Sequence, residues 1–192
     1  MKKTLILSLA LAGLTSAGLA TTAFADPPQP KIVVLDRAAI MQFSKAGQDI
    51  AKQMQAYSTQ AKADLQGQGR ALEEEERNLQ QQVAILAPDV KAKKIAAFQA
   101  RQQALQGQVA KKDEQMRYAF AQARAQMETK LGPILQGLVK SRGANMVLDK
   151  QAVVFATQGG FDITGDAINQ LNQQLPSLKV NFNVTPPPAP KK

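Results

Sequence analysis

The sequence predicts an α+β fold in which a long antiparallel coiled-coil hairpin of α-helices projects from a small β-sheet body. Residues 44–140 are rich in Ala, Gln, Lys, Glu, Arg and Leu, which lose little side-chain freedom in a helix. Their apolar residues recur in steps of three, four and seven, as in a helix with one partner helix. Runs rich in β-branched residues lie on both sides of this region, so the hairpin is predicted to be an insertion in one sheet.

The first 25 residues have the features of a cleaved secretory signal peptide. Two lysines follow Met1, an apolar stretch runs from Leu5 to Ala20, and small residues precede a predicted cleavage site between Ala25 and Asp26. An uncleaved anchor is the alternative, but about 16 apolar residues fall short of the roughly 20 that span a bilayer. Cleavage removes two lysines and no acidic residue, so the net charge of +9 falls by two.

The hairpin is predicted from mirror symmetry about the turn at 87–89, where Pro88 interrupts the helical pattern. In a tight antiparallel hairpin there, the numbers of facing residues add up to about 175. Apolar residues then face apolar residues and acidic ones face basic ones: Leu65 with Val109, Leu72 with Leu105, Met54 with Phe120, Phe43 with Leu131, Glu73–Glu76 with Arg101, and Asp64 with Lys111 and Lys112. Each arm of about 43 residues would be roughly 65 Å long. One continuous helix, kinked at Pro88 and dimerising in parallel, is the alternative.

Three glycines, Gly67, Gly69 and Gly107, fall at one level in this register. Glycine costs about 1 kcal/mol relative to alanine inside a helix, so three at one level weaken both arms there. A flexible joint about 30 Å from the turn is one interpretation. Close packing of the two helix backbones is the other, and the sequence leaves both open.

The body is predicted to contain three strands. Lys31–Leu35 is the first and lies in the segment 26–43 that begins the body. Asn145–Leu148 and Ala152–Phe155 are the second and third, joined by a turn at 149–151.

A short helix completes the body, which spans 141–176 after the arm. Asp162-Ile163-Thr164 offers capping residues for an amphipathic helix Gly165–Leu175, and Pro176 ends it. Three strands and this helix cannot bury their own apolar residues, and we expect the arms to point away from them. We therefore predict that copies of the chain associate through the body, with these residues at the interface: Ile32, Val34, Met146, Leu148, Val153 and Phe155.

The tail, 177–192, has two parts. Leu178, Val180, Phe182 and Val184 alternate with polar residues, a pattern that would fit an edge strand. The Pro-rich end after them is predicted to be extended and disordered.

The composition excludes several classes of function. The chain has no His, Cys or Trp, which rules out Ser-His-Asp and Cys-His triads, zinc sites of the Cys/His kind and disulfides. No phosphate-binding loop is present, and no cofactor is predicted. Asp162 and Asp166, or Glu73–Glu76, could be proposed as catalytic carboxylates, but a helix cap and a solvated helix face explain them better. The chain is therefore not predicted to be an enzyme.

The basic residues concentrate on the second arm and indicate anionic partners. We predict that they act collectively in binding acidic partner proteins: Lys91, Lys93, Lys94, Arg101, Lys111, Lys112, Arg117 and Arg124. Taken singly, each of them is more simply explained as solvating the coiled coil. Nucleic acid is a poor candidate partner, because no interleaved aromatics and no known module are present.

The order of these features resembles the Skp/OmpH family of periplasmic chaperones. The resemblance covers about 31–175 and includes Ser44-Lys45-Ala46-Gly47 before the first arm and Asp162-Ile163-Thr164 before the last helix. It implies a homotrimer in which strands of three chains complete a shared β-barrel and three hairpins surround a cavity. It also implies an ATP-independent periplasmic holdase for unfolded outer-membrane proteins.

Two other classes remain. The chain could be a structural spacer or tether of the cell envelope, with the arms as struts. It could also bind anionic polymers or a lipid or lipopolysaccharide surface through its positive charge.

Overall fold

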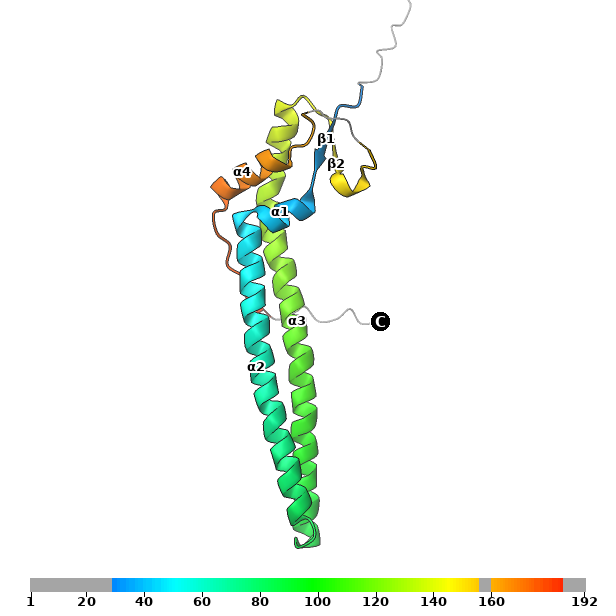
Figure 1. The fold of residues 1–192 in the computed structure, drawn as a ribbon, viewed down its shortest axis with the longest axis vertical. Coiled ribbons are helices and arrows are strands. Elements are labelled where there is room, and N and C mark those ends of the chain that lie inside the picture. The colour runs from blue at the N-terminus through cyan, green and yellow to red at the C-terminus, as the bar shows by residue number, and fades with distance from the viewer. Residues whose placement is uncertain (1–28, 156–159, 185–192) are drawn as a thin grey trace, which may run out of the picture.

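The computed structural model, which describes residues 29–155 and 160–184, is a helical hairpin mounted on a small base (Figure 1). The elements in chain order are β1 (Ile32–Leu35), α1 (Arg37–Phe43), α2 (Lys45–Gln82), α3 (Pro88–Ser141), β2 (Met146–Asp149), a short 3₁₀ helix η1 (Lys150–Ala152) and α4 (Thr164–Gln174). In the described ranges no helix is long and apolar enough to cross a membrane. The predicted cleavage site at Ala25 and Asp26 and the Pro-rich end lie outside the described residues.

The arm is formed by α2 and α3, which run antiparallel and differ in length, with 38 and 54 residues. The turn lies at 83–87, slightly before the expected 87–89, because α3 begins at Pro88. Proline suits the first helical position, where its fixed φ is preorganised and an amide donor is not needed. Asp89 follows in the first turn, where a carboxylate is favoured by the helix dipole. A single kinked helix is therefore excluded.

The mirrored register is confirmed along the outer arm. Arg101 forms an ion pair with Glu75 at 2.7 Å, as the charge pattern predicts. Leu65 and Val109 line one cavity between the helices, and Leu72 and Leu105 line another. The predicted pairing of Asp64 with Lys111 or Lys112 is wrong, because Asp64 instead accepts a hydrogen bond from Gln60 on its own helix.

Near the base the predicted pairing of Phe43 with Leu131 fails, because the chain bends at Ser44. Phe43 ends the separate short helix α1 and is 56% exposed, so it does not face Leu131. Phe120 is 38% exposed, and the buried residues around it on α3 are Ala119 and Ala123. Small residues there allow the helices to approach closely.

The helix α1, which the sequence pattern did not predict, has a side-chain cap at its start and a backbone cap at its end, where the Ser44 amide donates to the Ile40 carbonyl at 3.0 Å. Asp36 Oδ1 accepts a hydrogen bond from the Ala39 amide at 2.8 Å and caps its start. Ser44 ends α1 and caps α2, since its Oγ accepts from the Gly47 amide at 3.1 Å. These caps make a sharp corner between α1 and the arm.

The sheet is a parallel pair, β1 with β2, in which Ile32 is paired with Met146 and Leu35 with Asp149. The other edge of β1 is taken by the chain just before α4. There Val34 donates to the Phe161 carbonyl at 2.7 Å, and its own carbonyl accepts from Ile163. The predicted sheet of three strands is thus a parallel pair with a single bridge on the other edge of β1.

The predicted third strand, Ala152–Phe155, does not form in the single chain, and 149–151 is not a hairpin turn. The chain instead enters η1, where Asp149 Oδ1 accepts from the Gln151 amide at 3.0 Å. Val153 and Phe155 follow without strand pairing. A hairpin strand would pair with the outer edge of β2, which has no partner strand in the described residues, while the segment before α4 takes the free edge of β1.

The core lies where the sheet, α1 and α4 pack on the base of the arm. The buried residues of α3 belong to the same cluster as those of β1 and α4: Ala119, Ala123, Met127, Leu131, Ile134 and Leu138. The expectation that the arms point away from the sheet and cannot help to bury it is therefore wrong for α3 from Ala119 onward, because this helix continues beyond the start of α2 and runs beside α4 (Figure 1).

Two carboxylates of the base have lowered pKa values. The pKa of Asp149 lies below its ordinary value of 3.8, because the Gln151 amide donates to it and the Arg37 guanidinium pairs with it at 2.8 Å. Burial would raise the pKa of Asp162, but hydrogen bonds from Thr164 and Lys150 outweigh it and lower the value.

These shifts predict a loss of stability in acid. Because the folded pKa values are depressed, their contribution is complete above the unfolded value of 3.8 and disappears as pH falls below it. We expect the urea midpoint to drop between about pH 5 and pH 3, and to drop less in Asp162→Asn. An equal drop in that variant would contradict a contribution from Asp162.

Candidate functional site

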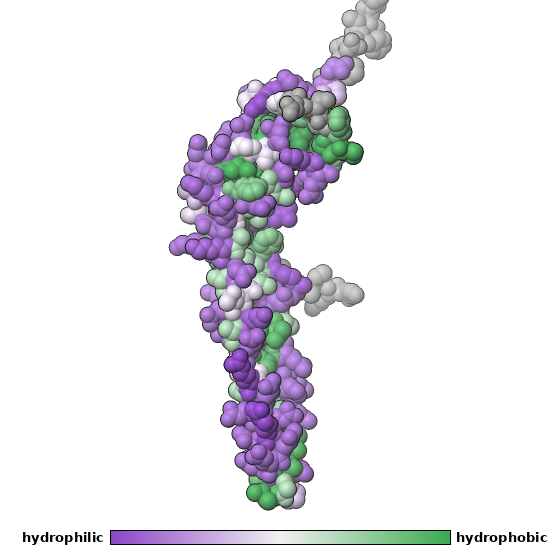
Figure 2. All heavy atoms as spheres, in the orientation of Figure 1, coloured by the Kyte–Doolittle hydropathy of each residue, from purple (hydrophilic) through white to green (hydrophobic). Residues whose placement is uncertain are grey.

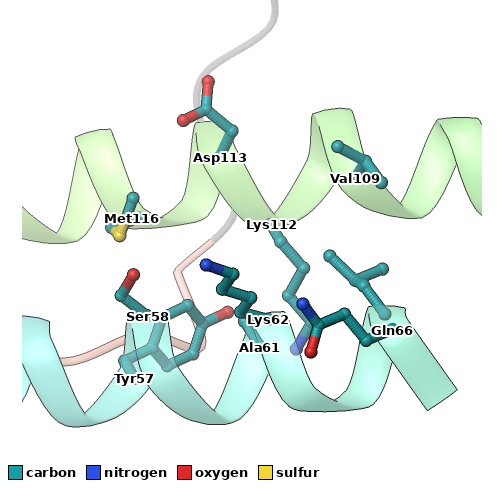
Figure 3. Close-up of a pocket in the computed structure, with 10 residues that line it drawn as sticks. Tyr57, Ser58, Ala61, Lys62, Gln66, Val109, Lys112, Asp113 and Met116 are labelled. Carbon is teal, nitrogen blue, oxygen red and sulfur yellow. The ribbon is translucent and has the colours of Figure 1, made fainter.

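The outer arm is the largest surface with an open apolar seam. None of residues 62–118 is buried, although the seam residues of both helices face one another. The helices leave cavities of about 430, 270 and 610 Å³ between them at successive levels toward the turn. Figure 3 shows the first of these, with Tyr57 and Ala61 on α2 and Val109 and Met116 on α3. Such half-covered apolar and Met side chains make adaptable contacts.

The eight basic residues predicted to bind clients lie on α3, and part of their charge is engaged locally. Arg101, Arg117 and Arg124 form ion pairs with Glu75, Asp113 and Glu128. Lys94 donates to Gln82 at 2.8 Å, and Lys112 lies 5.2 Å from the centre of the Tyr57 ring. Lys91, Lys93 and Lys111 are exposed and make no ion pair with any other residue that the structure describes.

The free end of the arm combines apolar and basic residues. Ile85 in the turn is 84% exposed, and Val90 at the start of α3 is 38% exposed. Figure 2 shows hydrophobic residues at this end, beyond the hydrophilic arm. Lys91 and Lys93 follow within one turn of α3. The charge pattern points to these lysines but not to the apolar tip, whose signal in the sequence is the run Val83-Ala84-Ile85-Leu86-Ala87 next to Pro88.

A second exposed apolar surface lies on the base. Of the six residues predicted to form an oligomer interface, Ile32, Met146 and Phe155 are exposed, at 41%, 48% and 83%. Leu148 and Val153 are half-buried, and Val34 is already buried within the chain. Two further apolar residues of this region are exposed although the sequence pattern did not single them out: Val147, which lies on the opposite face of β2 from Met146, and Val154.

Two of the candidate catalytic carboxylates, Asp162 and Asp166, are engaged with basic neighbours. Asp162 pairs with Lys150 at 3.2 Å, and its Oδ1 accepts from the Thr164 amide, which is a capping role for α4. Asp166 pairs with Arg142. In 29–155 and 160–184 no three His, Cys, Asp or Glu side chains come together in an arrangement that could hold a metal ion.

The geometry defines a class of protein in which a helical arm with an open apolar seam is mounted on a small base. The base exposes a second apolar surface. A family model of outer membrane proteins (OmpH-like) matches residues 31–171, which is most of the chain. The chain therefore belongs to the OmpH-like family, as the resemblance in its sequence predicts.

One solved structure has the same fold. A crystal structure from Caulobacter crescentus CB15, described as an OmpH-like outer membrane chaperone, superposes with a TM-score of 0.72. The match covers 81% of this chain and 91% of that one, at 21% identity. No curated protein sequence matches the chain significantly.

Proposed function

We propose that the chain is a periplasmic holdase chaperone that binds unfolded outer-membrane proteins, prevents their aggregation without ATP and delivers them toward membrane assembly. The OmpH-like family and the solved structure described as a chaperone support this role. The observation that carries the proposal is the outer arm, where residues 62–118 leave an apolar seam and three cavities open. Many weak contacts of this kind hold an unfolded client and release it without ATP hydrolysis.

We also propose that three chains assemble through the base, so that their strands complete a shared barrel and their arms surround a cavity. The outer edge of β2 has no partner strand in the described part of the chain. Exposed Met146, Val147, Val154 and Phe155 lie beside it or shortly after it. An unpaired edge next to apolar side chains is a site where another chain can add.

The direct test mixes the mature protein with an unfolded outer-membrane β-barrel protein diluted from urea. We expect light scattering to fall in the absence of ATP, and native mass spectrometry to detect the client with an oligomer. Absence of suppression would favour the alternative of a structural spacer or tether.

The same assay tests the role of the basic residues. Raising salt from about 50 to 500 mM shortens the Debye length from about 14 to 4 Å, so we expect slower capture of acidic clients. Replacing Lys91 and Lys93 by Gln should slow capture about threefold at low salt. Lys130→Gln with Lys140→Gln is the matched control, since these two exposed lysines of α3 lie near the base and outside the predicted client-binding set. Capture that is independent of salt would contradict the electrostatic contribution.

The apolar tip favours a second candidate function, contact with an anionic lipid or lipopolysaccharide surface. Ile85 can enter the interface while Lys91 and Lys93 approach the head groups, each worth about 1 kcal/mol near such a surface. We expect the protein to float with vesicles containing phosphatidylglycerol, but not with phosphatidylcholine alone. Ile85→Asp should abolish flotation. Flotation that survives this change would exclude the tip as the contact.

A further inference from the structure

Residues 177–184, the tail segment, lie extended along α2 and are held by its side chains. The Leu178 amide donates to Asp49 Oδ2 at 3.1 Å. Gln53 makes two hydrogen bonds, in which its Nε2 donates to the Leu178 carbonyl at 2.7 Å and its Oε1 accepts from the Val180 amide at 3.0 Å. One side-chain amide thus pairs with an extended backbone much as a neighbouring strand would. The predicted edge strand is therefore wrong, since the partner is a helix.

An aromatic stack ends this contact. The ring of Phe182 lies on that of Tyr57, with centroids 4.1 Å apart and planes 4° from parallel. The Tyr57 hydroxyl donates to Gln115 Oε1 on α3 at 3.1 Å, which fixes the ring between the two helices. Tyr57 also borders the 430 Å³ cavity drawn in Figure 3.

The contact recognises an alternating pattern rather than a specific sequence. Leu178 and Val180 are buried, whereas Lys179, Asn181 and Asn183 between and after them are exposed. From 178 to 182 an extended chain advances about 13 Å, and α2 from 49 to 57 advances about 12 Å, so the spacings match. The polar contacts given above all go to backbone groups. Any extended segment with alternating apolar side chains could make them.

Two observations indicate that the tail segment is exchangeable. It makes no backbone-to-backbone hydrogen bond with any other described residue, so side chains alone hold it. It also lies outside the region that the family model matches, which ends at 171. Strands of outer-membrane barrels alternate apolar and polar residues in the same way.

We propose that the surface formed by Asp49, Gln53 and Tyr57, the tail site, binds an extended segment of an unfolded client, and that the tail segment occupies this site as a built-in competitor. This inference rests on the proposed function and specifies where and how a client strand is held. A client then gains the site only by displacing the tail. Its apparent affinity is reduced in proportion to the fraction of molecules whose site is covered.

The test compares binding of an unfolded outer-membrane barrel to full-length variants. Phe182→Ala loosens the tail but leaves the site intact, so we expect the client Kd to fall by up to about tenfold. Tyr57→Ala removes the aromatic ring on which the tail segment packs and on which we propose that the client packs, so the client Kd should rise. Asn183→Ala, at an exposed tail position, is the matched control and should change nothing. An unchanged or higher client Kd in Phe182→Ala would contradict the proposal that the tail segment competes with the client.

A spin label provides a second readout that does not require a weakened tail. Because the chain has no cysteine, Asn183→Cys can be labelled alone, with Gln173→Cys on α4 as the control. We expect client to increase the mobility of the label at 183 and to leave that at 173 unchanged. A bound client that leaves the label at 183 immobile would overturn the inference. Failure of every form to bind the client would instead contradict the proposed function.

Discussion

Replacing Gly47 by alanine is expected to destabilise the base by about 3 kcal/mol. A Cβ there would lie 2.0 Å from the carbonyl oxygen of Met41 and 2.7 Å from its carbonyl carbon. Both are backbone atoms of α1, so relief requires moving α1 away from the start of α2. The movement would also disturb the capping bond from the Gly47 amide to Ser44 Oγ, which is buried. Urea unfolding followed by circular dichroism measures the loss.

Gly67→Ala is the matched control in the same helix. A Cβ at Gly67, Gly69 or Gly107 meets nothing within 4 Å, so each alanine should stabilise the arm by about 1 kcal/mol. A neutral Gly47→Ala would contradict the close approach at the corner. The open space also excludes close backbone packing as the reason for the three glycines in the arm. The flexible joint stays a prediction, and hydrogen exchange of the triple alanine variant tests it, because unchanged protection of the arm would rule it out.

The sequence predicts the arm well because its signal is repeated many times. Leu65 with Val109, Leu72 with Leu105 and Glu75 with Arg101 all obey one register, so an error at any single position does not matter. The corner at Ser44 has no such redundancy. One capping serine separates two helices, and the apolar spacing continues across it, so that Phe43 at the end of α1 fits the apolar pattern of the arm.

Segments whose conformation depends on a distant partner were predicted less well. Ala152–Phe155 has the composition of a strand, but β-propensity measures how well side chains fit a pleated surface, and the single chain offers none there. The alternation of Leu178 and Val180 does mark one buried face, yet the hydrogen bonds come from Gln53 on a helix. Local pattern gives the extended conformation and the buried side. It cannot tell whether the partner is a strand, a helix or another chain.

The exposed residues of the base carry the second large prediction, the loss of the proposed oligomer. Val154 is 102% exposed and Phe155 83%, a degree of exposure that is costly for two consecutive large apolar residues unless another surface covers them. Burying each contributes about 1.5–3 kcal/mol, and symmetry repeats this contribution in every subunit. Val154→Asp with Phe155→Asp should therefore convert the oligomer to monomers at micromolar concentration.

The measurement is native mass spectrometry, supported by sedimentation velocity at several concentrations. Ile85→Asp is the matched control, because Ile85 is equally exposed, at 84%, but lies at the far end of the arm. It should leave the subunit number unchanged. A dissociated Val154→Asp, Phe155→Asp variant whose circular dichroism matches the wild type places the interface at the base, since the helices α2 and α3 fold within one chain. An intact oligomer in that variant would show that the interface does not involve β2 and the segment after it. It would also contradict the proposed shared barrel.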